Sequence, residues 1–397
     1  MENKTIEKAK KHVMSTYGSY PIVFDHGKGC YLYDDAGKKY LDFVAGIAVN
    51  ALGYGHEKLV EKISEQAKKL THVSNLYYNE PAVELAEKFT DYAEMDKVFF
   101  CNSGAEAVEA ALKLSRVYCK KNKSEKAHKI ISMKNSFHGR TFGAISATGQ
   151  TKYQKDLNPL MPTVEFAEFN NLDDVKSKIN EDTAAIIVEP IQGEGGINPA
   201  DLEFLKGLRS VCDDENIVLI FDEVQSGIGR TGKLFAYQKF GVYPDIVACA
   251  KGLGGGVPMG AILAKKEFAD AFVPGSHAST FGGNALSASA ALVVLDELME
   301  NGLMENVSTQ GEHLKEVLYE LKEKSKFITN VKGEGLMLGI SVDGIETSKI
   351  VGKAMEKGLL LVGAGSNVIR FVPPLIVTEK EIDEFKSIME SVLEELE

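Results

Sequence analysis

The chain has 397 residues, and its 44% hydrophobic content is enough for one large core and a smaller second one. With 45 basic and 57 acidic residues its net charge is −12, which disfavours nucleic acid and anionic membranes as general partners. Its five cysteines are widely spaced and form no CxxC pair, and no uncharged stretch is long enough to span a bilayer. We therefore expect a reduced, cytoplasmic protein without a metal site.

The sequence pattern of residues 1–55 predicts the first segment of a small domain. A short helix comes first, and a hairpin follows in which residues 30–33 and 39–43 form the strands. The turn between them, at residues 34–37, contains two aspartates and a glycine, which are common turn residues.

Residues 56–285 predict a large α/β domain. Helices alternate here with short apolar strands, and this rhythm is typical of a largely parallel sheet with helices on its faces. Strands are expected at residues 97–101, 129–133, 184–188, 217–221 and 245–250, and helices at residues 81–92 and 105–121.

Residues 286–397 predict the C-terminal part of the small domain, with α+β composition. An alanine-rich helix leaves the large domain near residue 285. Residues 333–340 predict a buried strand after a turn, and a last helix runs from residue 378 to the end. No internal repeat or low-complexity tract interrupts this order.

A tight turn between a strand and a helix offers the first candidate site. Ser103, Gly104 and Ala105 follow the apolar run that ends at Cys101 and open the expected helix. A helix N-terminus presents unpaired N–H groups and about half a positive charge, and a glycine there lets a ligand approach the backbone closely. These residues are candidates for holding a phosphate, although an ordinary helix cap by Ser103 explains the same pattern.

The next candidate run contains an aromatic residue, Phe137, and an arginine, Arg140. Phe137 could stack on a flat ring, and Arg140 could bind a carboxylate through two parallel hydrogen bonds. Only five of the 45 basic residues are arginines, so each arginine is a candidate for a site that needs its fork. His138, between them, fits a supporting or structural position better than a proton shuttle.

Two charged residues at strand ends carry the strongest pattern. Asp222 closes the apolar run 217–221, and Lys251 closes the run 246–250 before several glycines. Ligands of open α/β sheets bind at the carboxyl ends of the parallel strands, so the two charges are expected to share one site. Pyridoxal phosphate needs a lysine to hold its aldehyde as a Schiff base and a carboxylate to keep its pyridine nitrogen protonated. The pair meets both needs.

Other polar residues follow strands or lie in nearby loops. Glu194 stands in a glycine-rich loop and is a candidate for lining the site. Gln225, three residues after Asp222, could donate a hydrogen bond to the phenolic oxygen of a pyridoxal ring. Ser279 and Thr280 are a hydroxyl pair that could add phosphate contacts. A solvated loop carboxylate and a simple turn are the alternatives for Glu194 and for the hydroxyl pair.

Together these runs resemble the class III pyridoxal-phosphate aminotransferases along nearly the whole chain. The runs that carry the resemblance are residues 221–232, 251–256 and 274–280. The resemblance implies the fold-type I aminotransferase architecture, with a large domain built on a mostly parallel sheet flanked by helices and a smaller α+β domain. It also implies pyridoxal 5'-phosphate as the cofactor, and a homodimer whose active sites lie at the subunit interface.

The resemblance assigns cofactor contacts residue by residue. Gly104 and Ala105 match phosphate ligands, and Thr280 matches a phosphate ligand that the partner subunit contributes. Contacts to the ring and its phenolic oxygen are implied for Phe137, Asp222, Glu223, Val224 and Gln225. Lys251 matches the lysine that binds the aldehyde.

Substrate contacts are implied for Arg140 and Ser279, with Arg370 as a second carboxylate-binding arginine and Glu194 as the acidic residue associated with it. The implied reaction moves an amino group from N2-acetyl-L-ornithine to 2-oxoglutarate, giving N-acetyl-L-glutamate 5-semialdehyde and L-glutamate in arginine biosynthesis. Ornithine, 4-aminobutyrate and succinyldiaminopimelate stay open as the amine, because enzymes for all of them share this site plan.

Two other classes of protein stay open at this point. A pyridoxal phosphate mutase or decarboxylase would keep Lys251 and Asp222 but would not depend on an amino acceptor. A non-catalytic nucleotide-binding protein would carry no lysine-bound cofactor.

Overall fold

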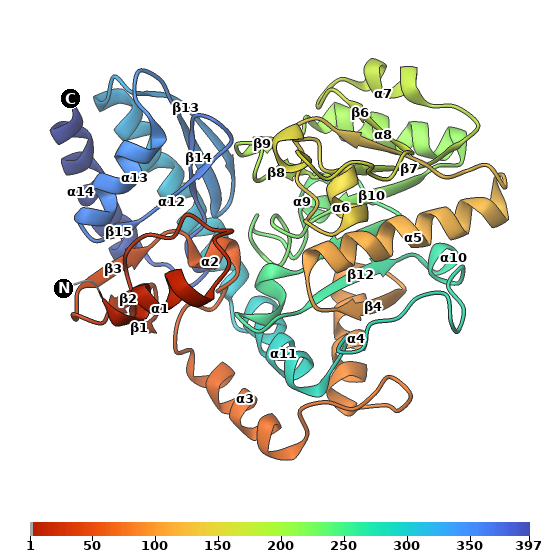
Figure 1. Ribbon diagram of the computed structural model, residues 1–397, viewed down its shortest axis with the longest axis horizontal. Helices are drawn as coiled ribbons and strands as arrows, with labels where there is room; N and C mark the ends of the chain where they lie inside the picture. Colours follow the sequence, from red (N-terminus) through yellow and green to blue (C-terminus); the bar gives the residue numbers. More distant parts are fainter. Residues whose placement is uncertain (1–2) are drawn as a thin grey trace.

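The computed structural model describes residues 3–397, and a seven-stranded sheet with the order β4-β12-β11-β10-β7-β5-β6 forms the centre of its larger part (Figure 1). The strands are β4 (Lys97–Cys101), β5 (Lys129–Met133), β6 (Val164–Ala167), β7 (Thr183–Val188), β10 (Val218–Asp222), β11 (Ile246–Cys249) and β12 (Gly260–Ala264). Neighbouring strands are parallel except at β12, which runs antiparallel to β11 and β4. The predicted α/β fold with a mostly parallel sheet is confirmed.

The central strands are apolar because helices cover the sheet on both faces. Every residue of β5, β7, β10, β11 and β12 is buried. Strands covered in this way need continuous apolar runs rather than alternation. The helix α5 (Gly104–Asn122) packs across β12, β11 and β7, and α8 (Leu202–Glu215) packs on β10. Asp222, at the end of β10, is a charged residue after four apolar ones.

All five strands predicted for this sheet are present, each within one residue at either end. The strands β6 and β12 are additional to the prediction. The sequence of β12, Gly-Ala-Ile-Leu-Ala, follows a glycine-rich run and a proline, so its first residues resemble a continuing loop.

Segments near the two ends of the chain build a second sheet together. Its order is β1 (Phe24–Lys28), β2 (Tyr31–Asp34), β3 (Lys39–Asp42) and β15 (Leu359–Leu360). The predicted hairpin is β2 and β3. The strand β15 pairs in parallel with β3, with Leu359 opposite Leu41, so a late segment completes a sheet begun at the other end of the chain (Figure 1).

A third sheet is antiparallel and contains the segment 333–340. Its order is β13 (Ile328–Glu334), β14 (Met337–Val342), β17 (Val368–Phe371) and β16 (Val362–Ala364). The single strand expected at 333–340 is wrong, because Gly335 adopts a φ of +57° and reverses the chain there. Glu334 and Met337 therefore face each other across a hairpin.

The predicted helices at 81–92 and 105–121 and the last helix are present within one residue of the expected positions. Two small sheet strands, β8 (Ile191–Gln192) and β9 (Asn198–Pro199), pair with each other. Among residues 3–397 no helix has the length and apolarity needed to cross a membrane. The helices not yet given are α1 (Lys4–His12), α2 (Ala45–Ala48), α3 (Glu57–Lys69), α4 (Glu80–Ala93), α6 (Phe142–Ala147), α7 (Leu172–Lys178), α9 (Ala236–Phe240), α10 (Lys266–Ala269), α11 (Ala285–Met299), α12 (Leu303–Lys324), α13 (Thr347–Glu356) and α14 (Glu379–Leu396), with the short 3₁₀ helices η1 (Thr151–Tyr153) and η2 (Lys251–Gly254).

Candidate active site

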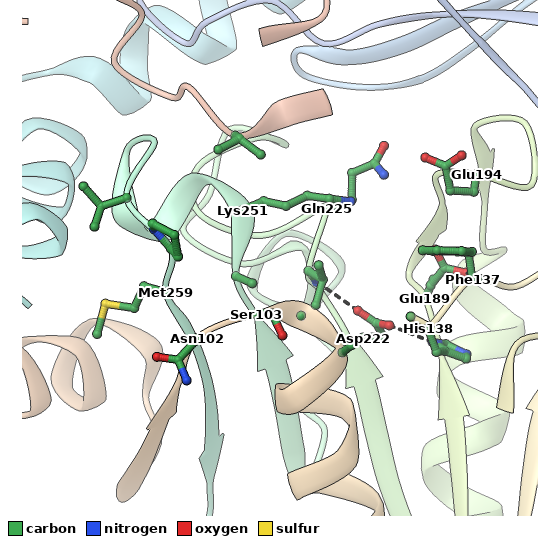
Figure 2. Close-up of a pocket in the computed structure, with 18 of the residues that line it drawn as sticks. Asn102, Ser103, Phe137, His138, Glu189, Glu194, Asp222, Gln225, Lys251 and Met259 are labelled. Carbon is green, nitrogen blue, oxygen red and sulfur yellow. Dashed lines mark hydrogen bonds and ion pairs between the residues drawn. The ribbon is translucent and has the colours of Figure 1, made fainter. Parts of the chain in front are cut away.

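Asp222 and Lys251 line the same cavity of about 340 Å³ (Figure 2). Asp222 ends β10, and Lys251 follows the end of the parallel neighbour β11, with Asp222 in register with Ala248. This register delivers both charges to one edge of the sheet, as the strand-end positions predict. The other predicted residues in the lining are Ser103, Gly104, Ala105, Phe137, Glu194, Val224 and Gln225.

Asp222 is held by a buried histidine and by its own loop. His138 Nδ1 lies 2.6 Å from Asp222 Oδ2, and the two side chains are 0% and 3% exposed. The Val224 N–H donates to Asp222 Oδ1 at 3.0 Å. Burial alone would lower the pKa of His138, but the hydrogen bond and charge of Asp222 outweigh burial and raise that pKa. His138 thus supports the carboxylate, the position that the sequence favours for it.

The turn before α5 provides a helix N-terminus in the cavity wall. Ser103 is the N-cap of this 19-residue helix, and its Oγ accepts the Glu106 N–H at 3.2 Å. A Cβ on Gly104 would lie 2.6 Å from Val224 Cγ1, so a side chain does not fit there without displacing Val224. The first N–H groups of a helix lack partners within the helix and carry the positive end of its dipole. The turn is therefore both a capped helix start and a site suited to a phosphate.

A buried carboxylate positions the ring of Phe137 in the cavity lining. Glu189 directly follows β7 and accepts the N–H groups of Phe137 at 3.0 Å and of Gly193 at 3.3 Å. Burial raises the pKa of Glu189 to about 7, against the opposing effect of His138. Glu189 is not among the predicted site residues, although its place directly after a buried strand is the same pattern that singles out Asp222.

Lys251 has an unusual backbone conformation, and the pKa of its amine is lowered. It opens η2 with a φ of +45°, a conformation that residues other than glycine rarely adopt and that is often held at functional sites. Burial, and after it the positive charge of Arg370, lowers the pKa of the Lys251 amine to about 8. More of this amine is neutral near neutral pH than in an ordinary lysine, as a nucleophile and proton acceptor requires.

Arg370 reaches the cavity from the third sheet through two lining residues. It lies on β17, and its Nη1 donates to Glu194 Oε1 at 2.6 Å and to Gln225 Oε1 at 3.0 Å. Burial would raise the pKa of Glu194, but the charge and hydrogen bond of Arg370 outweigh burial and lower it. With its oxygen on Arg370, Gln225 keeps its amide N–H groups for donation, which is the orientation its predicted role needs. The association of Glu194 with Arg370 is present in the structure.

Glu223 does not bring its side chain to the cavity. Its carboxylate is buried and accepts the N–H groups of Ala236 at 2.6 Å and Tyr237 at 2.9 Å, at the start of α9. Burial raises the pKa of Glu223 to about 7. Hydrogen bonds from α9 therefore hold this side chain outside the cavity lining.

Three further predicted residues, Arg140, Ser279 and Thr280, lie outside the cavity lining. Arg140 and Thr280 are exposed, and Ser279 is half-buried. Asn102 lines the cavity, and its Nδ2 donates to Ser279 Oγ at 3.1 Å. The Arg140 guanidinium carbon lies 5.7 Å from the centre of the Phe137 ring. Arg140 and Ser279 thus stand beside residues of the lining, whereas Thr280 does not line the cavity of its own chain.

Comparisons with known proteins agree with this geometry. A sequence model of the family described as Aminotransferase class-III matches residues 13–393. The acetylornithine aminotransferase of Clostridium acetobutylicum is 53% identical over 383 residues, covering 96% of this chain and 99% of that protein. The similarity therefore spans nearly the full length of both sequences.

Solved structures share the fold at lower identity. The acetylornithine aminotransferase of Elizabethkingia anophelis has a TM-score of 0.87 and 36% identity, covering 98% of each chain. The ornithine aminotransferase of Toxoplasma gondii, whose structure reveals partial occupancy of PLP at its active site, has a TM-score of 0.95 and 30% identity. That match covers 100% of this chain and 94% of the other.

Proposed function

The chain belongs to the class-III aminotransferases, and on this basis we propose that it transfers the amino group of N2-acetyl-L-ornithine to 2-oxoglutarate. The products are N-acetyl-L-glutamate 5-semialdehyde and L-glutamate, and the reaction serves arginine biosynthesis in the cytoplasm. The observation that supports amino transfer with pyridoxal phosphate is that Asp222 and Lys251 line the same cavity. The likeness to acetylornithine aminotransferases supports the choice of amine.

Pyridoxal 5'-phosphate supplies an aldehyde that takes up the amine and a ring that withdraws electrons from the neighbouring carbon. The residues present fit this cofactor. The helix start at Gly104 suits the phosphate, and Phe137 offers a ring face in the lining. Asp222 suits the ring nitrogen, and Gln225 has amide N–H groups for the phenolic oxygen.

Lys251 is the residue that we assign to proton transfer. Its lowered pKa gives a neutral Nζ that can accept the proton leaving the amino-bearing carbon of the substrate. Asp222 would keep the ring nitrogen of the bound cofactor protonated, and His138 holds Asp222 in place through its hydrogen bond. Removal of either the amine or the carboxylate should therefore stop turnover without unfolding the site.

The two arginines suit two substrates that each carry an α-carboxylate while one of them reacts at its far amine. We assign the α-carboxylate of acetylornithine to Arg140, which is exposed beside Phe137. The guanidinium of Arg370 is meanwhile bound by the carboxylate of Glu194. 2-Oxoglutarate carries a second carboxylate, and Arg370 is the cation placed to bind it.

We propose that two copies of the chain pair through a face with large exposed apolar side chains. Leu76 is 84% exposed and Tyr78 is 97% exposed. Asn75 Nδ2 donates to the Ser279 carbonyl at 3.0 Å, which fixes this segment against the loop that carries Thr280. Exposed apolar patches mark interaction surfaces, and pairing here would carry Thr280 toward the partner's cofactor. Sedimentation should give twice the mass of one chain, and an active monomer would contradict the pairing.

A half-reaction screen tests the proposed amine. The spectrum of the bound cofactor is followed while acetylornithine, ornithine, 4-aminobutyrate and succinyldiaminopimelate are offered one at a time. Acetylornithine should convert the cofactor to its amine form at the lowest concentration. Initial-rate lines for the full reaction should run parallel, as a double-displacement mechanism requires. A clear preference for another amine would replace the proposed substrate.

A further inference from the structure

Next to Phe137 of the cavity lining, the ring of Tyr153 has two cations on it. Tyr153 ends the short helix η1 and is half-buried. Arg140 Cζ lies 4.2 Å from its ring centre, and Lys152 Nζ lies 4.7 Å from the same point. Within the part of the chain that the structure describes, neither cation forms a hydrogen bond or ion pair with a protein group.

Two unneutralised cations on one ring are an unusual arrangement. The face of an aromatic ring attracts each cation, and no carboxylate of the described residues forms an ion pair with either of them. An anion that enters this region would be attracted by both charges and would gain a charge-assisted hydrogen bond from the cation that it reaches. Arg140 and Lys152 therefore provide the positive charge of a site that would bind a carboxylate.

The segment that carries Tyr153 is fastened to the active-site region on both sides. Gln154 Nε2 donates to the carbonyls of Ile145 at 3.0 Å and Thr148 at 2.9 Å. Gln150 Nε2 donates to the carbonyl of Ser136 at 3.1 Å, next to Phe137. The two glutamines thus fix η1 relative to the run 136–140, so the fold sets the backbone positions of Lys152 and Tyr153 relative to Arg140.

This cation pair is linked to the cavity by contact and by charge. Tyr153 meets Phe137 edge-on, with ring centres 5.3 Å apart and planes at 75°, and Phe137 lines the cavity. After the larger effects of burial, Arg370 and Lys251, the charge of Lys152 also lowers the pKa of Glu194 in the lining. The field of Lys152 therefore reaches the substrate cavity.

We propose that Lys152 is a second cation of the substrate-carboxylate subsite and that Tyr153 is a positioning residue that holds Arg140 and Lys152 around it. The ligand is a carboxylate remote from the reacting amine, as in an ω-amino acid. The inference rests on the proposed function for the identity of the amine. It adds a determinant of specificity on η1, because an amine without that carboxylate gains nothing from Lys152.

Lys152→Met tests the charge, and Lys155→Met, an exposed lysine three residues away, is its matched control. The holoenzyme half-reaction is followed with acetylornithine and with N-acetylputrescine, which has the same amide and amine but no carboxylate. Lys152→Met should lower the second-order rate constant for acetylornithine about two- to fivefold, the range of an exposed ion pair. N-acetylputrescine should react at an unchanged rate.

Tyr153→Leu tests the ring, and Tyr153→Phe, which keeps the ring, is its control. Tyr153→Leu should lower the rate constant for acetylornithine about two- to fivefold. Tyr153→Phe should stay near wild type with both amines, and the loss in Tyr153→Leu should be larger with acetylornithine than with N-acetylputrescine. Equal losses with both amines would overturn the proposal, since they would indicate general damage. Equal behaviour of Lys152→Met and Lys155→Met would overturn it as well.

The wild-type enzyme separates this inference from the proposed substrate. If it reacts with L-glutamate and ornithine but not with acetylornithine, the proposed amine is wrong. The same variants are then judged with ornithine and putrescine, which differ only in the carboxylate. A loss confined to ornithine would uphold the subsite, and equal losses would overturn it.

Discussion

His138 and Asp222 form a 2.6 Å hydrogen bond between side chains that are almost completely buried. Hydrogen bonds to charged groups contribute about 1.5–3 kcal/mol, so we expect His138→Leu to lower kcat about 10- to 100-fold. His138→Asn can keep a donor near the Nδ1 position and should lose less. Steady-state kinetics at saturating cofactor would measure both changes. Equal losses in the two variants would indicate a packing effect instead.

Lys251 should become reactive at a lower pH than an ordinary lysine in the cofactor-free enzyme. With a pKa of about 8, its amine is protonated well below that pH and neutral above it. The rate of Lys251 acylation, measured by mass spectrometry, should therefore rise with a midpoint near pH 8. The midpoint for an ordinary lysine amine is about pH 10.4. Arg370→Gln removes a positive charge that disfavours protonation, so it should shift the midpoint upward. A wild-type midpoint near the ordinary value would contradict the buried amine.

Gly104→Ala should weaken the binding of pyridoxal phosphate. The new Cβ would lie 2.6 Å from Val224 Cγ1, and overpacking of this kind costs about 1–3 kcal/mol, or roughly 10-fold or more in affinity. Adding Val224→Ala should recover most of the loss, because it removes the clashing methyl groups. Gly352→Ala, where a Cβ meets nothing within 4 Å, is the control. Absorbance titration measures the affinity for the cofactor. If Val224→Ala does not restore this affinity, the effect of Gly104→Ala does not come from the clash with Val224.

Glu194→Gln should favour the substrate that carries two carboxylates. The carboxylate of Glu194 lies 2.6 Å from Arg370 and competes with a substrate carboxylate for the guanidinium. We expect the half-saturating concentration of L-glutamate to fall about three- to tenfold, while that of acetylornithine does not fall. Glu203→Gln, an exposed carboxylate on α8, is the control. A weaker response to glutamate would mean that Glu194 assists Arg370 instead of competing with it.

The sequence predicts that Asp222 and Lys251 share one cavity because each follows a continuous apolar run, and such runs identify parallel strands. It does not show that the side chain of the neighbouring Glu223 lies outside the cavity, since this depends on hydrogen bonds from α9 to its carboxylate. The bond between Glu194 and Arg370 joins residues 176 positions apart, so only the family resemblance anticipates it. Local pattern thus predicts strand-end chemistry, whereas long-range packing determines which charges meet.

Segment 333–340 and the strand β12 show the same limit within the fold. The expected single strand contains Gly335, whose positive φ makes a hairpin, and the sequence alone does not tell a turning glycine from one inside a strand. The strand β12 is short and follows a glycine-rich run, and its antiparallel partners come from β4 and β11. Its place is set by pairing with strands far away in the sequence.

The parallel pairing of β15 with β3 has a consequence for how the protein is made. During synthesis the hairpin of β2 and β3 leaves the ribosome first, but the strand that closes its open edge is made near the end of the chain. The residues of the central sheet emerge in between and can pair with one another before β15 exists. Such non-local pairing is slow, and an unclosed edge can pair with other chains. The sheet of β1, β2 and β3 is thus completed only after all strands of the central sheet have been made.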